Sequence, residues 1–140
     1  MKQLDQIRKL VKKEADEDDW KFHILPVLKY AKLLSRGRRV NQEVLELAVL
    51  LHDIGRIKFG DKNHEITGIK EAERILKKYK YSPEIIKEIK HCVASHRKSR
   101  KVRPETEIAK IMANADAMAH LDILPVFFYW RSKKENFCEA

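Results

Sequence analysis

The sequence is short of glycine, with four in 140 residues, and nowhere alternates apolar with polar residues over the length of a strand. That alternation marks half-buried strands, so its absence argues against a β-rich fold. The two cysteines, Cys92 and Cys138, are too few and too far apart for a disulfide framework. No apolar run reaches the length of a membrane span, and the first residues form no hydrophobic signal region. We therefore expect a cytoplasmic protein that does not enter a membrane.

Positive charge is the excess in this chain, with a formal net charge of +9. A long-range positive field favours anionic partners, and phosphorylated small molecules and nucleic acid both qualify. Taken alone, the positive charge is better explained by a lysine-rich surface that confers solubility than by an anionic partner. The basic residues are spread over several loops without interleaved aromatics, which argues mildly against nucleic acid as the partner.

Apolar residues recur at helical spacing along the chain, which predicts an all-α fold. We expect one compact domain over residues 1–140, built as a bundle of about six or seven helices. Its core is expected in residues 19–121, with a C-terminal helix and tail in residues 122–140. Asn41 and Ser82 are typical capping residues, and each is expected to begin a helix.

Several stretches carry expectations about helix breaks and buried faces. Pro26 either kinks the second helix or marks a later start, and Pro125 starts or kinks a last aromatic segment. Two glycines predict a loop over residues 56–63. The inner face of the next helix is expected to include Ile66. For the aromatic run 127–130, we favour packing in the core over forming the wall of a nucleobase pocket or a dimer contact.

The most apolar stretch, residues 44–51, ends in His52 and Asp53. Such a run indicates a buried central segment, where an imidazole and a carboxylate are costly unless each has a strong partner. Other helices place further polar side chains on their apolar faces. These inward-facing residues are His23, His64, His96 and Asp116.

Each of these residues alone is explained as a hydrogen-bonded core residue. Several unpaired buried polar groups would together exceed the usual stability margin, whereas a divalent cation would satisfy them at once. Mixed imidazole and carboxylate ligands suit Mn, Fe, Co, Ni or Zn, and a carboxylate-rich face also holds Mg. The spacing of these histidines and aspartates along the sequence by itself favours a metal site only slightly.

The order His, then His-Asp, then Asp resembles the HD-domain superfamily of metal-dependent phosphohydrolases. The segments that carry this resemblance are Asp19–His23 (DWKFH), Leu50–Gly55 (LLHDIG) and Asn114–Ala117 (NADA). Two more segments, His64–Gly68 (HEITG) and Ser95–Arg97 (SHR), resemble the branch with additional histidines. The resemblance runs from about residue 19 to residue 121.

The resemblance implies an all-helical fold around a central metal site holding one or two ions. The four family ligands map onto His23, His52, Asp53 and Asp116. His64 and His96 map onto positions that bind a second metal in some branches, and Asp53 would then bridge the two ions. With a single ion, His64 and His96 are expected to bind the substrate phosphate or to move protons.

Nearby residues have two interpretations each. Arg56 and Arg97 can bind the substrate phosphate or remain solvated surface charges, and we weigh these equally. Glu65 is a candidate general acid or base, although an acidic residue in a first helical turn needs no such role. His91 points to another face of its helix and is expected to be structural, whereas His120, one turn after Asp116, can support that carboxylate.

These inferences predict a metal-dependent phosphohydrolase that cleaves a phosphoester or phosphoanhydride, with a nucleotide as the favoured substrate. A metal-activated water attacks phosphorus, and Asp53, Glu65, His64 and His96 are the candidate catalytic residues. One alternative is a non-catalytic, metal-containing module that binds a nucleotide or nucleic acid. Another is a di-iron oxidase, which the resemblance allows. We expect a monomer or a homodimer.

Overall fold

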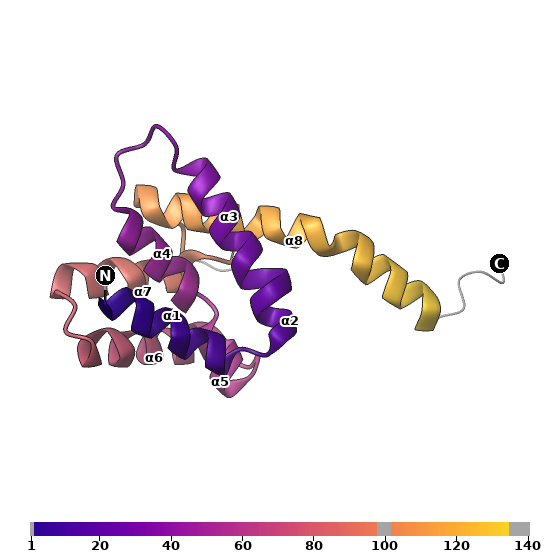
Figure 1. Cartoon of the computed structure of the whole chain (residues 1–140), viewed down its shortest axis with the longest axis horizontal. Coiled ribbons are helices and arrows are strands. Elements are labelled where there is room, and N and C mark those ends of the chain that lie inside the picture. Colours follow the sequence, from indigo (N-terminus) through magenta and orange to yellow (C-terminus); the bar gives the residue numbers. More distant parts are fainter. Residues whose placement is uncertain (1, 98–101, 135–140) are drawn as a thin grey trace.

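The computed structural model describes residues 2–97 and 102–134, and every regular element within these ranges is helical, which confirms the all-α prediction. Figure 1 shows the helices gathered into one bundle, from which the C-terminal part of the last helix extends. In chain order the elements are α1 (Lys2–Glu14), α2 (Glu17–Asp19), the π-helical turn η1 (Trp20–Ile24), α3 (Leu25–Leu34), α4 (Gln42–Leu51), α5 (Ile54–Phe59), α6 (His64–Lys78), α7 (Pro83–Ser95) and α8 (Glu107–Lys134).

Helix α4 forms the centre of the core. It packs against α1, α3, α7 and α8, as expected for a helix that is apolar around most of its circumference. The predicted cap begins it, because the side-chain oxygen of Asn41 accepts hydrogen bonds from the backbone nitrogens of Glu43 at 3.0 Å and Val44 at 3.2 Å. The apolar run thereby carries His52 into the middle of the domain.

The second predicted helix is divided into η1 and α3 by the proline within it. The N–H of Leu25 donates to the carbonyl oxygen of Trp20, five residues earlier, so the turn is wider than an α-helical turn. Pro26 follows in the first turn of α3 and has no N–H to give to Phe22. The elements α2, η1 and α3 follow one another without a gap from Glu17 to Leu34, so Pro26 does not mark a later start and the helix is instead distorted ahead of it. Turns of this kind are frequent at functional sites, and this one carries His23.

Residues 56–63 are not a continuous loop as predicted, because Ile54–Phe59 forms α5. The glycine in this helix allows α5 and α6 to cross backbone to backbone. A Cβ atom on Gly55 would lie 2.3 Å from the carbonyl oxygen of His64 and 2.4 Å from the nitrogen of Gly68. This crossing holds the start of α6 beside Asp53.

The predicted inner face of α6 is wrong at Ile66, which is 56% exposed. The helix is rotated so that His64, Gly68 and Glu71 are buried, since the close crossing at Gly68 fixes which side meets α5. Glu71 is paired with Lys58 at 2.6 Å, so this lysine is not a solvated surface charge.

Of the two outcomes expected at Pro125, the start of a new segment is wrong, because α8 continues through this proline to Lys134. The hydrogen bond lost there involves the carbonyl of Leu121, a residue that is 64% exposed, where solvent can satisfy it. Core packing of the aromatic run is wrong for Phe128 and Tyr129, both exposed, because this part of α8 extends beyond the bundle (Figure 1). The side chains of Phe127 and Trp130, and Cys138, lie outside the described residues. Over the described ranges, no helix combines the length and apolarity needed to cross a membrane.

Candidate metal centre

Six metal-competent side chains from five segments of the chain converge beside the C-terminal end of α4. All six were predicted to face inward, and the structure brings every one of them together. They are His23 on η1, His52 and Asp53 between α4 and α5, His64 at the start of α6, His96 after α7, and Asp116 on α8.

Four of these side chains point one atom each at a common centre. The Nε2 atom of His23 lies 3.0 Å from Nε2 of His52, 3.1 Å from Oδ2 of Asp53 and 3.2 Å from Oδ1 of Asp116. The Nε2 atom of His52 lies 3.3 and 3.4 Å from the same two oxygens. Ligands bound to one ion at about 2.0–2.2 Å are about 3.0–3.5 Å apart in neighbouring positions, so these separations fit a shared cation.

The other carboxylate oxygen of Asp53 faces a second pair of histidines. Its Oδ1 atom lies 3.5 Å from Nε2 of His96 and 4.0 Å from Nε2 of His64. The two oxygens of one carboxylate are thus directed at two different histidine pairs. The backbone of Asp53 lies in the sparsely populated bridge region, at φ −107° and ψ 12°, where many active-site residues are found.

The orientation of the three most buried imidazoles is fixed by the backbone. A carbonyl can only accept, so Nδ1 is protonated in each ring and Nε2 is left for a metal or a second proton. Each Nδ1 atom donates to the carbonyl oxygen three residues earlier: His52 to Val49 at 2.6 Å, His96 to Val93 at 2.7 Å, and His64 to Asp61 at 3.1 Å.

Two atoms of the cluster test whether the site fits a metal. Among the described residues, Nε2 of His64 and Oδ1 of Asp116 are buried side-chain atoms without a hydrogen-bond partner. Leaving a buried polar group unsatisfied costs about 1–3 kcal/mol, and more for a charged one. A divalent cation would satisfy both, and imidazole with carboxylate is a suitable donor set for Mn, Fe, Co, Ni or Zn.

The ionisation of the cluster follows from the same proximity. Burial lowers the pKa of His52, but Asp53 and Asp116 outweigh this and hold it well above the usual value. The pKa of His23 is also raised, by the same two carboxylates against burial. Burial raises the pKa of each carboxyl, yet the histidines reverse this, so both pKa values lie below the usual range. An incoming ion must therefore compete with protons for these imidazoles.

This competition predicts how pH and metal act on stability. A raised histidine pKa stabilises the fold fully below the unfolded value of 6.5 and loses that effect as pH rises through the folded pKa. The lowered pKa values of Asp53 and Asp116 stabilise the fold above pH 3.8, and this stabilisation is lost as pH falls through the folded pKa values. We expect the Tm of metal-free protein to be highest between pH 3.8 and pH 6.5, the unfolded pKa values of the carboxyl groups and the histidines. Added Mn²⁺ or Co²⁺ should raise Tm more at pH 8.5 than at pH 6. Thermal melts with chelator and with metal check this, and a metal effect that shrinks with pH would contradict it.

Two arginines predicted to bind phosphate are both held by carboxylates. Arg56 donates to Asp19 at 3.0 and 3.3 Å, and its Nη2 atom lies 3.4 Å from Oδ2 of Asp53. Arg97 lies 3.4 Å from Oε1 of Glu65, the candidate acid or base. The sequence did not indicate that Asp19 anchors Arg56.

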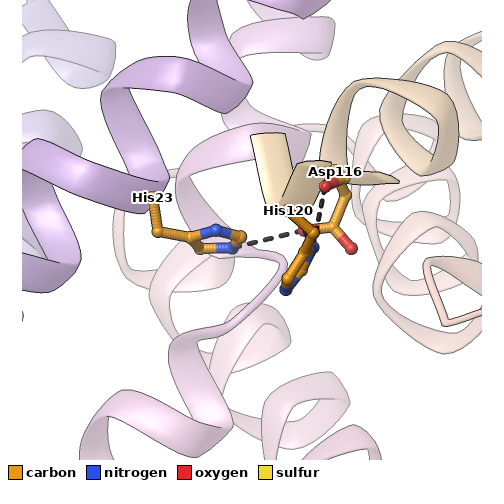
Figure 2. Close-up of side chains that lie close together, drawn as sticks. All are labelled: His23, Asp116 and His120. Atoms are coloured by element: carbon orange, nitrogen blue, oxygen red, sulfur yellow. Dashed lines mark hydrogen bonds and ion pairs between the residues drawn. The ribbon is translucent and has the colours of Figure 1, made fainter. Parts of the chain in front are cut away.

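The two remaining histidines differ in position. His91 is away from the cluster, and its Nε2 atom accepts a hydrogen bond from the backbone nitrogen of Glu105 at 3.0 Å, as befits the structural role expected for it. His120 is close to the cluster, with its ring centroid 4.9 Å from that of His23. Figure 2 shows it beside Asp116 and His23. Its spacing of one helical turn after Asp116 was the signal for this position.

Comparison with known families decides what kind of domain this is. The family model described as "HD domain" matches residues 22–121, most of the chain. The chain belongs to the HD domain family. The resemblance to the HD-domain superfamily is thereby confirmed, whereas membership of the branch with additional histidines stays a prediction. The matched range contains every member of the metal-competent cluster.

The HD fold of this chain is also similar to a solved structure. A crystal structure of a predicted HD superfamily hydrolase from an uncultured Thermotogales bacterium superposes with a TM-score of 0.69 at 24% sequence identity. The similarity covers 91% of this chain and 74% of that one. No curated protein matches the chain.

Proposed function

We propose that this HD domain is a metal-dependent phosphohydrolase acting on a small phosphorylated compound, with a nucleotide as the favoured substrate. The observation that carries the proposal is the carboxylate of Asp53, whose two oxygens face the histidine pairs His23–His52 and His64–His96. The description of the Thermotogales protein as a predicted hydrolase is consistent with this proposal.

In this proposal, each residue of the cluster has a role in holding or orienting the metal ligands. His23, His52, Asp53 and Asp116 would hold one ion, and His64 and His96 would hold a second together with Asp53. When bound, a divalent ion supplies the nucleophile by lowering the pKa of coordinated water to about 7, and polarises the phosphoryl group. The backbone carbonyls behind the histidines keep the imidazoles aimed at the centre.

Substrate reaches the cluster from one side. The side chains of His52, His64 and His96 are at most 2% exposed, whereas those of His23, Asp53 and Asp116 are 10–13% exposed. Arg56 lies on this open side next to Asp53, with its side chain 27% exposed and its fork held in place by Asp19. A planar guanidinium positioned in this way suits a phosphate oxygen, as expected for the phosphate-binding role.

Replacing Arg56 tests this role without removing a metal ligand. We expect Arg56→Lys to lower kcat/KM for a phosphorylated substrate on the order of 10–100-fold, because a charge-assisted hydrogen bond is worth about 1.5–3 kcal/mol and lysine cannot reproduce the fork. The metal content should be unchanged. Arg38→Lys is the matched control, since Arg38 pairs with Glu107 and is not part of the cluster. If both variants lowered kcat/KM equally, the interpretation of Arg56 as a phosphate-binding residue would be wrong.

A substrate screen tests the proposed reaction. Purified protein is offered nucleoside mono-, di- and triphosphates, cyclic nucleotides and sugar phosphates with Mn²⁺, Co²⁺, Ni²⁺, Zn²⁺, Fe²⁺ or Mg²⁺, and released phosphate or nucleoside is measured. Metal-dependent release that His52→Ala abolishes is the expected result. Salt-sensitive RNA or DNA binding without turnover would instead support a binding module. Oxygen consumption by iron-loaded protein would support a di-iron oxidase.

A further inference from the structure

His120 stands beside the centre but outside the four predicted ligands. It follows Asp116 by four residues on α8, so both side chains project from the same face of the helix. Its Nδ1 atom lies 3.6 Å from Oδ1 of Asp116 and 2.8 Å from the backbone oxygen of the same residue. In Figure 2, its ring lies between the ring of His23 and the Asp116 side chain.

The atoms around His120 are suitable for a cation. His23, Asp116 and His120 each offer one ligand atom, and these three atoms lie within 4.8 Å of one another. The buried Oδ1 atom of Asp116 has no hydrogen-bond partner among the described residues. The backbone carbonyl of Asp116 can only accept a hydrogen bond, so Nδ1 of His120 carries the proton and the lone pair of Nε2 remains for a ligand role.

Exposure places His120 on the opposite side of the centre from the buried ligands. Its side chain is 59% exposed, compared with 13% for His23, 10% for Asp116 and 1% for His52. The four predicted ligands therefore surround an ion from the protein side, and His120 is positioned to approach it from the solvent side. No other described histidine is on that side, since His91 binds Glu105 elsewhere.

We propose that His120 is an additional, solvent-side ligand of the ion held by His23, His52, Asp53 and Asp116. The inference rests on the proposed metal centre and extends it. A third imidazole on this ion favours Co²⁺, Ni²⁺ and Zn²⁺ over Mg²⁺, which prefers oxygen ligands. The imidazole is exposed rather than packed, so a phosphate oxygen of the substrate can take its place on the ion.

The test is the coordination and affinity of the metal in His120→Ala, with His91→Ala as the matched loss of a histidine outside the cluster. X-ray absorption of Zn²⁺-loaded protein counts the imidazoles on the metal, and competition with a chelator gives the affinity. We expect His120→Ala to lose one imidazole per protein, to bind Co²⁺ and Zn²⁺ on the order of 10–100-fold more weakly, and to change Mg²⁺ affinity much less. His91→Ala should match the wild type in all three.

The outcomes separate this inference from the proposed function. If wild-type protein bound no divalent metal, the proposed function and this inference would both be wrong. If the wild type bound metal while His120→Ala kept the same imidazole count, His120 would not be a ligand and the proposed function would stand. A merely supporting hydrogen bond from His120 to Asp116 would weaken affinity without changing the imidazole count, so that result also counts against the inference.

Discussion

Asp53→Asn is expected to empty both metal positions and to lower hydrolysis by roughly a thousandfold or more, because several kcal/mol of transition-state stabilisation would be lost and each 1.4 kcal/mol is a factor of ten. The reason is geometric: Oδ2 lies 3.1 and 3.3 Å from the His23 and His52 nitrogens, and Oδ1 lies 3.5 Å from that of His96. An amide keeps the shape of the side chain but removes the negative charge. Metal content after dialysis and the initial rate on the best substrate of the screen are the measurements.

Two variants make this result specific. His96→Gln removes an imidazole whose Nε2 atom faces Oδ1 of Asp53, on the side of the second histidine pair, so about one ion should remain bound while the second is lost. Asp18→Asn, at an exposed position of α2, should keep full metal content and full activity. If Asp53→Asn retained both ions, the interpretation of Asp53 as a bridging carboxylate would be wrong. If it lost metal but hydrolysis continued, the metal-dependent mechanism would be wrong.

Gly55→Ala is expected to destabilise the fold by about 3 kcal/mol, at the upper end of the usual cost of overpacking. The added Cβ would lie 2.3 Å from the His64 carbonyl oxygen and 2.4 Å from the Gly68 nitrogen. Both are backbone atoms and cannot rotate away, so α5 and α6 must separate. His64 then moves away from Asp53. We expect Tm to fall by roughly 10 °C and the second metal position to be weakened.

Gly37→Ala is the matched control for a glycine substitution. Gly37 has a φ of 73°, and a Cβ atom there would meet no other atom within 4 Å. Its cost should therefore be limited to left-handed backbone strain of about 1 kcal/mol, without any effect on metal content. If Gly55→Ala behaved in the same way as Gly37→Ala in denaturant unfolding and metal binding, the close crossing would not be important for the site.

Helical periodicity predicted which polar residues face inward because it is a local property of the chain. His52 ends an apolar run whose members are buried on nearly every side, and His96 follows Ile89 and Cys92 on one face of α7. The caps at Asn41 and Ser82 are also local, since each side chain binds backbone nitrogens two or three residues ahead. These features needed no knowledge of distant contacts.

The errors arose where a distant contact outweighed local preference. Ile66 has the right residue type for a buried face, yet the crossing at Gly55 and Gly68 rotates α6 and leaves it exposed. Phe128 is exposed because α8 continues beyond the bundle, and no local signal defines where the bundle ends (Figure 1). Pro26 predicted an irregularity in the helix that carries His23, but it did not predict that this irregularity would be a widened turn.

The sequence by itself determined which metal-competent side chains face inward, because residue identity and helical phase are local properties of the chain. These side chains are His23, His52, Asp53, His64, His96 and Asp116. Only the tertiary structure decided that Oδ2 and Oδ1 of Asp53 face different histidine pairs, that Asp19 holds Arg56, and that His120 reaches the open side. Such relations depend on how helices cross, and a crossing is fixed by the fit of side chains from segments far apart in the sequence.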